Sequence, residues 1–380
     1  MAVAVPGDSF PERARAFIKR ETVLVLACSL AIVSVFLVPP SAAYIGYIDF
    51  KVLGCLFSLM VVVAGFRKVH LFDHMAFFLL RRVHSLRQVS GVLVGITFFT
   101  SMWITNDVSL LTFVPFTLVV FTLCGDRKPI LLTVVLQTVA ANIGSSLTPV
   151  GNPQNLYIYS FYGMGGGEFF TTMLPLVVSG ALLLVVFLWG VHGGSGMVSI
   201  PLEQPEPVER ALLVRYLILF IIAIASVFNL VPWYLAVVVI ALAAQKTLLK
   251  QVDYSLLLTF VVFFIFVGNM GAIEPVKRFL ERLLEGRVFL TSLFASQIIS
   301  NVPATLLLAP FTDGSRQLLL GVNAGGCGTL IASLASVISF KGYVKHDPDG
   351  AGRYLGVFTL VNIAFVALFM LIWTLLLRNV

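Results

Sequence analysis

Long apolar runs dominate the chain, and short polar segments separate them. Several runs approach the roughly 20 residues that an α-helix needs to cross the hydrocarbon core of a bilayer. The runs lie at residues 22–38, 52–66, 169–190, 211–230, 233–249, 256–267 and 355–377. The pattern predicts an all-α polytopic membrane protein in which nearly the whole chain belongs to the membrane domain.

One segment breaks this pattern inside a predicted span. Residues 141–155 read ANIGSSLTPVGNPQN, with prolines, glycines and several polar side chains between two apolar flanks. Backbone at bilayer depth leaves the helix only where protein or a water-filled cavity satisfies its N–H and C=O groups. The segment therefore predicts an interrupted helix at a binding site.

Three blocks of sequence recur in the same order, which indicates an internal repeat. The first begins at Asp49 and again at Asp253. The second, WITNDVSLLTFVPF from residue 103, matches IISNVPATLLLAPF from residue 298 and aligns Asn106 with Asn301. The third aligns ANIGSSLTPVGNPQN with NAGGCGTLIASLAS at residues 323–336, pairing Asn142 with Asn323, Asn152 with Ser333 and Asn155 with Ser336. We expect two repeats, each with a re-entrant hairpin at the second block and a broken transmembrane helix at the third.

The expected organisation follows from these blocks. It comprises a cytoplasmic arm at residues 1–21, a first repeat at 22–196, a linker at 197–210 rich in Pro and Glu, and a second repeat at 211–380. An amphipathic segment connects the first two blocks of each repeat, at 66–88 and 274–285, and we expect both to lie at the membrane surface as helices rather than as solvated loops. The predicted apolar face of the second comprises Val276, Phe279, Leu280, Leu283 and Leu284.

Counting crossings gives about nine full spans and two hairpins, so that equivalent helices run in opposite directions. Basic residues concentrate on the cytoplasmic side of membrane proteins, which favours a cytoplasmic N-terminus and an outer C-terminus in the inner membrane of the cell. This orientation places the following loop residues inside: Arg67, Lys68, Arg81, Arg82, Arg87, Arg127, Lys128, Lys246, Lys250, Lys341, Lys345 and Arg353.

Composition supports the membrane class and excludes others. Hydrophobic residues make up 59% of the chain and charged residues 11%, against about 25% charged in a soluble domain. The net charge of +7 falls in short loops, so it orients the protein in the bilayer and does not indicate a nucleic-acid partner.

The hairpin tips and broken helices carry hydroxyl, amide and carboxylate oxygens, which suit a hard cation such as Na⁺. Asp107 is the one carboxylate expected near the bilayer centre, where it would ligate Na⁺ or carry a proton. The alternative for Asp107 is a hairpin-turn cap with access to water. The candidate cation-binding residues are Asn106, Asp107, Ser145, Ser146, Thr148, Ser300, Asn301, Thr305 and Thr329.

A second set of polar and small residues lies beside these breaks, where half-helix N-termini attract an anionic group. The candidate substrate-binding residues are Thr105, Asn142, Asn152, Asn155, Asn323, Gly325, Gly326, Ser333 and Ser336. Four of them, Asn152, Asn155, Ser333 and Ser336, have an equally good alternative role, since small polar residues also hold membrane helices together.

The break at 141–155 and the two tips resemble the motifs of the ion transporter superfamily, whose members include divalent-anion/sodium symporters, arsenite permeases, sodium/proton antiporters and proteins with citrate-transporter-like domains. The resemblance implies a scaffold domain, a mobile transport domain with elevator-like movement, and a homodimer. It assigns Ser145, Ser146, Thr148 and Asn106 to a first cation site, and Ser300, Asn301, Thr305 and Thr329 to a second. Thr105 and Val302 depart from the family pattern of Ser-Asn-Thr tips, which argues against two identical sites.

The predicted function is secondary active transport of a small anion, either an inorganic oxyanion or a carboxylate, coupled to Na⁺ or H⁺. Two alternatives remain: a sodium/proton antiporter or arsenite efflux permease in which Asp107 titrates, and an ion channel on the same fold. We expect no enzymatic activity, because no Ser/His/Asp arrangement or His cluster accompanies the expected cavity. No ATP-binding loop motif occurs in the sequence, and we expect no cofactor other than the coupling ion.

Overall fold

The computed structural model describes residues 18, 21–191 and 204–377, and the regular secondary structure of these residues is helical throughout. The all-α prediction is confirmed. Nearly all of the expected cytoplasmic arm and half of the expected linker, residues 197–203, lie outside the described residues.

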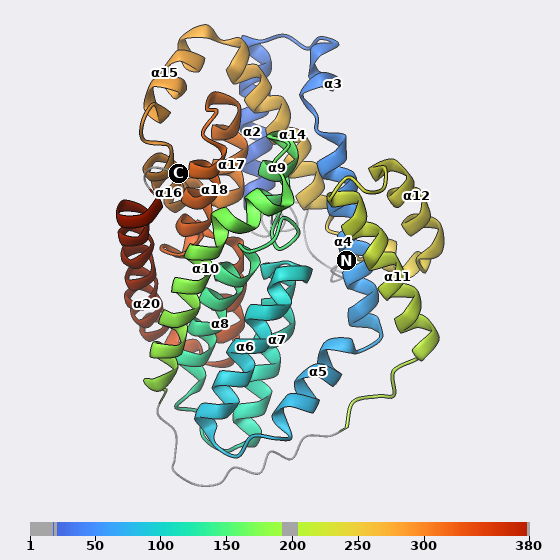
Figure 1. Ribbon diagram of the computed structural model, residues 1–380, viewed down its shortest axis with the longest axis vertical. Helices are drawn as coiled ribbons and strands as arrows, with labels where there is room; N and C mark the ends of the chain where they lie inside the picture. The colour runs from blue at the N-terminus through green and yellow to red at the C-terminus, as the bar shows by residue number, and fades with distance from the viewer. Residues whose placement is uncertain (1–17, 19–20, 192–203, 378–380) are drawn as a thin grey trace, which may run out of the picture.

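The helices follow one another along the chain as Figure 1 shows. They are α2 (Thr22–Leu37), α3 (Ala43–Tyr47), α4 (Phe50–Lys68), α5 (Leu71–Leu80), α6 (Leu86–Ile104), α7 (Asn106–Leu123), α8 (Ile130–Ser145), α9 (Pro153–Phe161), α10 (Gly166–Trp189), α11 (Arg210–Val227), α12 (Trp233–Ala243), α13 (Lys246–Leu249), α14 (Tyr254–Ala272), α15 (Glu274–Leu284), α16 (Val288–Ile299), α17 (Asn301–Leu308), η1 (Ala309–Phe311), α18 (Ser315–Gly326), η2 (Leu330–Ala332), α19 (Leu334–His346), η3 (Pro348–Gly350), α20 (Ala351–Ile372) and η4 (Trp373–Leu377).

Among the described residues, six helical segments are long and apolar enough to cross a membrane. They are α4, α7, α10, α11, α14 and the segment Pro348–Leu376 that contains α20. The chain is therefore a multi-pass membrane protein.

The single span expected at residues 233–249 is wrong. Helix α12 ends at Ala243 and α13 begins at Lys246, with extended backbone at Ala244 and Gln245 between them. The side chain of Gln245 accepts a hydrogen bond from Lys68 at the end of α4. This contact joins the link between α12 and α13 to the end of α4, and local hydropathy does not reveal it.

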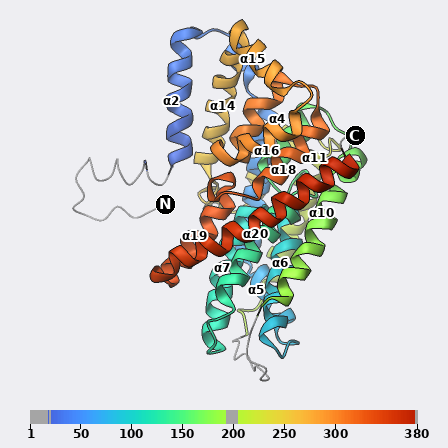
Figure 2. The ribbon, with the colours of Figure 1, turned by 90° about the vertical axis from the view of Figure 1, so that its left-hand side faces the viewer.

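The helices that open each half of the chain pack against the other half. Helix α2 packs along α14, while α11 and α12 pack along α4 (Figures 1 and 2). Glycines allow two close approaches between the halves: the ring of Tyr216 of α11 lies directly on Gly65 of α4, and the ring of Tyr47 of α3 lies directly on Gly268 of α14. Helices from the start of each half therefore pack against the other half and hold the two halves together.

The remaining helices form two similar groups, in which α6 packs along α8 and α16 packs along α18. Each pair again approaches closely at a glycine. Gly144 of α8 lies against the main-chain oxygen of Phe98, and Gly325 of α18 lies against that of Leu293. This close approach brings the ends of α6 and α8, and of α16 and α18, to the same depth.

The two amphipathic connectors form helices, and α5 and α15 lie at opposite ends of the long axis of the molecule (Figure 1). On α15, Leu280 and Leu284 are buried, whereas Phe279 is 63% and Leu283 44% exposed. The predicted apolar face of α15 is therefore divided between the protein and its surroundings, as expected of a helix that rests on both protein and membrane.

Candidate functional site

Two single residues connect the helices of the candidate hairpins. Thr105 joins α6 to α7, and Ser300 joins α16 to α17. Their backbones have nearly the same conformation, with φ 74° and ψ 148° at Thr105 and φ 73° and ψ 152° at Ser300. A positive φ at a residue other than glycine costs about 1–3 kcal/mol, and such strain concentrates at functional sites. The aligned tips thus share a strained geometry as well as a sequence pattern.

The residues that follow the tips cap their own helices. The Oδ1 atom of Asn106 accepts a hydrogen bond from the N–H of Asp107 at 3.0 Å, and the Oδ1 atom of Asn301 accepts one from the N–H of Val302 at 2.9 Å. Both asparagines are 4% exposed. Each tip consequently presents a fixed amide next to a helix N-terminus.

The broken helices occur where the sequence predicts them. Helix α8 ends at Ser145 and α9 begins at Pro153, while α18 ends at Gly326 and α19 begins at Leu334. We call residues 146–152 the first turn and residues 327–333 the second turn. Asn152 caps α9 by accepting a hydrogen bond from the N–H of Asn155 at 2.9 Å.

Each turn is tied in the same way to the helix that precedes the tip of its own half. The hydroxyl of Thr148 donates to the main-chain oxygen of Met102, and that of Thr329 donates to the main-chain oxygen of Gln297 at 2.9 Å. Met102 and Gln297 both lie three residues before the tip residue. The turns and tips therefore form one unit in each half.

Asn142 makes three hydrogen bonds, two of which connect the two halves. Its Oδ1 atom accepts from Asn106 Nδ2 and from Ser333 Oγ, both at 3.0 Å, and its Nδ2 atom donates to the main-chain oxygen of Gly326 at 3.1 Å. Asn142 is 4% exposed and Ser333 is 1% exposed. A first-half asparagine thus satisfies the end of helix α18.

Asn323 makes the reciprocal connection from the second half. Its Oδ1 atom accepts from Asn152 Nδ2 at 3.2 Å, and its Nδ2 atom donates to Asn155 Oδ1 at 2.7 Å and to the main-chain oxygen of Leu319 at 2.8 Å. Asn142 and Asn323, which the repeat alignment pairs, therefore both reach across to the opposite half.

Several candidate cation ligands use their hydroxyl protons locally. Ser145 and Ser146 donate to the main-chain oxygen of Asn142 at 3.1 and 2.7 Å, and Thr305 donates to that of Asn301 at 2.7 Å. A hydroxyl that donates in this way keeps its oxygen lone pairs for accepting or coordinating. The arrangement suits a cation better than a ligand that needs hydrogen-bond donors.

The remaining candidates fall into different surroundings. Asp107 Oδ1 and Ser336 Oγ are buried and have no hydrogen-bond partner among the described residues. Buried polar atoms are nearly always paired, so these two atoms are candidates for contact with a bound ion, solute or water. Thr329 is exposed, although its main chain and hydroxyl are both held by Gln297.

Sequence reasoning missed two residues that shape the second turn. Gln297 donates to the main-chain oxygen of Gly325 at 2.7 Å, and Asn362 of α20 accepts from the N–H of Gly328 at 3.3 Å. An amide inside an apolar helical run was the available signal for both residues.

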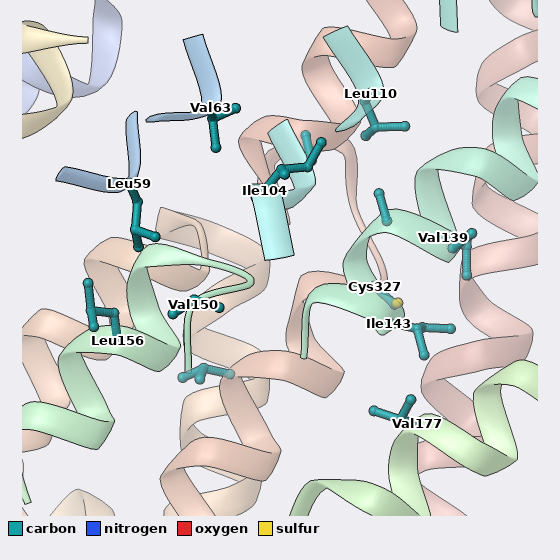
Figure 3. Close-up of a cluster of buried hydrophobic side chains, with 14 of the residues drawn as sticks. Leu59, Val63, Ile104, Leu110, Val139, Ile143, Val150, Leu156, Val177 and Cys327 are labelled. Atoms are coloured by element: carbon teal, nitrogen blue, oxygen red, sulfur yellow. The ribbon is translucent and has the colours of Figure 1, made fainter. Parts of the chain in front are cut away.

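Apolar side chains enclose these polar turns. Ile104 precedes the first tip, Val150 lies in the first turn and Cys327 opens the second turn; all three are buried (Figure 3). Surroundings of low polarity strengthen the hydrogen bonds between the turns and make any unpaired polar group costly.

A multi-pass helical protein with interrupted helices whose polar turns meet in apolar surroundings has the architecture of a membrane solute transporter. The chain belongs to the citrate transporter family, whose sequence profile matches residues 14–325.

Curated relatives agree with this class. An uncharacterized transporter of Methanocaldococcus jannaschii is 31% identical over 311 residues, which cover 81% of this chain and 84% of the relative. An inner membrane protein of Escherichia coli is 33% identical over 304 residues, covering 77% of this chain and 80% of the relative. A silicon efflux transporter of Oryza sativa is 33% identical over a shorter stretch of 150 residues, covering 37% of this chain and 30% of that protein.

Proposed function

We propose that this membrane transporter is a secondary active transporter that moves a small anion, an inorganic oxyanion or a carboxylate, coupled to Na⁺ or H⁺. The observation that carries the proposal is the pair of reciprocal asparagine connections, in which Asn142 bonds to Ser333 and Asn323 bonds to Asn152. A site assembled from both halves is sensitive to their relative position, as alternating access requires.

The ends of the interrupted helices favour binding of both ion types. Helices α7, α9, α17 and α19 begin beside the tips and turns, and the partial positive charge of a helix N-terminus attracts an anion. Helices α8 and α18 end there, so that their terminal carbonyl groups attract a cation. The predicted cation-binding and substrate-binding sets are proposed to serve these two roles.

The proposal extends to the organisation of the chain as two inverted repeats with re-entrant hairpins. Repetition of the strained tips, the broken helices and the glycine contacts supports it, as does the location of α5 and α15 at opposite ends. The basic residues near α5 support a cytoplasmic N-terminus and an outer C-terminus. Elevator-like movement and a homodimer are proposed from the resemblance to the ion transporter superfamily.

A second candidate is an efflux antiporter in which Asp107 exchanges protons. The buried, unpaired Oδ1 atom of Asp107 favours it, and so does the presence of Val302 at the corresponding position of the second half. The name of the rice relative, a silicon efflux transporter, gives the same direction of transport. In this case one titrating carboxylate serves the whole protein.

The test is transport by the purified chain in liposomes under imposed Na⁺ or pH gradients, with citrate, phosphate, arsenite and silicic acid as solutes. We expect gradient-driven accumulation of one of them above its equilibrium level. Asp107→Asn should abolish the coupling, whereas Asp349→Asn, at an exposed position in η3, should not. Na⁺/H⁺ exchange without any solute would favour the antiporter, and equilibration without accumulation would indicate a channel.

A further inference from the structure

The first turn has a dedicated side chain that satisfies its carbonyl groups. Asn155 of α9 donates from Nδ2 to the main-chain oxygens of Ser145, Ser146 and Thr148, at 3.3, 3.2 and 3.1 Å. Asn155 is completely buried, so without this amide the three carbonyl groups would lose a partner in apolar surroundings. The first turn is therefore held by the helix that follows it.

The second turn lacks this side chain. The position that corresponds to Asn155 is Ser336, which is also completely buried and whose hydroxyl has no hydrogen-bond partner among the described residues. A serine side chain is too short to reach carbonyl groups in the preceding turn in the way that the asparagine does. The second turn must obtain its donor from elsewhere.

Gln297 of α16 supplies that donor. Its Nε2 atom donates to the main-chain oxygens of Gly325 at 2.7 Å and Cys327 at 3.4 Å, and its Oε1 atom accepts from the N–H of Thr329 at 2.8 Å. Cys327 is the counterpart of Ser146, so this one equivalent carbonyl group is served by different side chains in the two halves.

The neighbouring residues fit this arrangement. Gly328 has φ +136°, a conformation that favours glycine, and a Cβ atom there would meet the side chain of Gln297. The first-half counterpart of Gln297 is Met102, whose thioether has no hydrogen to donate. The glutamine, the glycine and the unpaired serine occur together in the second half.

We propose that Gln297 is the positioning residue of the second turn and replaces the function that Asn155 has in the first. It holds Thr329 against the hairpin tip at Ser300, and thereby sets the geometry of the second candidate cation site; this last step rests on the proposed function. As a consequence, the first turn is held both by the helix before its tip and by the helix after it, whereas the side chain that holds the second turn comes from the helix before its tip.

The first experiment measures amide hydrogen exchange at residues 326–333 in the full chain in lipid nanodiscs. Gln297→Met, which introduces the first-half residue, removes a donor and an acceptor, so exchange should be about tenfold faster. Adding Ser336→Asn, which introduces the first-half donor, should bring exchange to within about threefold of the wild type. The N–H of Gly328 donates a hydrogen bond to Asn362 and serves as an internal reference.

Gln297→Glu separates the two functions of the amide and does not depend on how well the methionine variant folds. It keeps an acceptor for the N–H of Thr329 but loses the donor for Gly325 and Cys327, so exchange should stay slow at Thr329 and rise around Cys327. Gln317→Met, elsewhere on the second-half helices, is the matched control. Unchanged exchange in Gln297→Met, or no recovery in the double variant, would overturn the assignment.

The second experiment measures thermal stabilisation by NaCl relative to choline chloride. The Na⁺ concentration for half-maximal stabilisation should rise about tenfold in Gln297→Met, since a looser turn must be ordered by the ion, and should return in the double variant. An altered exchange pattern without any Na⁺ stabilisation of the wild type would refute sodium coupling in the proposed function and leave the role of Gln297 in the turn intact.

Discussion

The hydrogen bond between Asn142 and Ser333 predicts a measurable coupling between two residues that lie in different halves of the chain. Asn142 makes three buried hydrogen bonds, and a single bond between membrane helices contributes about 0.6 kcal/mol on average and up to about 1.7 kcal/mol. Asn142→Leu should therefore lower the free energy of unfolding by about 2 kcal/mol, and Ser333→Ala by about 0.6 kcal/mol or more. In the Asn142→Leu background, Ser333→Ala should cost almost nothing, because its partner is already absent.

The assay is a double-mutant cycle, with unfolding followed by circular dichroism in mixed micelles of increasing denaturing-detergent content. The cycle should give a coupling energy of about 0.6–1.7 kcal/mol. Ser339→Ala is the matched control, because the hydroxyl of Ser339 is also buried on α19 but donates within its own helix, to Ala335 at 3.3 Å. Additivity within about 0.3 kcal/mol for Asn142 and Ser333 would refute a direct bond between the halves.

Three further predictions concern packing and charge. Gly144→Ala should lower the melting temperature because its Cβ atom would collide with the main chain of α6. The control Gly95→Ala, in open space on α6, should be neutral or stabilise the protein by up to about 1 kcal/mol. Equal losses in the two variants would contradict the packing argument. Gly268→Ala should also lower the melting temperature, because a tyrosine ring of α3 occupies the space, and a change no larger than that of Gly95→Ala would argue against this contact. Glu168→Gln should lower the free energy of unfolding by less than about 1 kcal/mol, since the 2.8 Å ion pair of Glu168 with Arg316 is partly exposed. The difference between variant and wild type should vanish at about 1 M salt. A loss of stability that persists there would point to a role other than the ion pair.

Much of the local structure could be predicted from the sequence because it depends on properties of short segments. Clusters of proline, glycine and polar residues weaken an apolar helix, which predicted interruptions that fall after Ser145 and before Asn106. The capping carboxylates Asp49 and Asp253 accept hydrogen bonds from the N–H groups of Val52 and Leu256. Each begins a helix at the position that the repeat alignment indicated.

The interruption after α12 was not predicted from the properties of the local segment. Hydropathy is continuous enough from Trp233 to Leu249 to predict one helix, yet the helix ends at Ala243. The link at Ala244 and Gln245 is extended, and Gln245 contacts Lys68 of α4. This contact joins positions 177 residues apart, which the hydropathy of the segment does not report.

The sequence by itself determined the membrane class, the order of the helices, and the two tips and two turns that supply the polar groups. Only the tertiary structure decided how these groups pair: Asn142 with Ser333, Asn323 with Asn152, and Gln297 with the second turn. The physical reason is that helix formation and its interruption depend on neighbouring residues, whereas a hydrogen bond between turns depends on helices that pack together from distant parts of the chain. The sequence identified the individual polar residues, and the fold determined their hydrogen-bond partners.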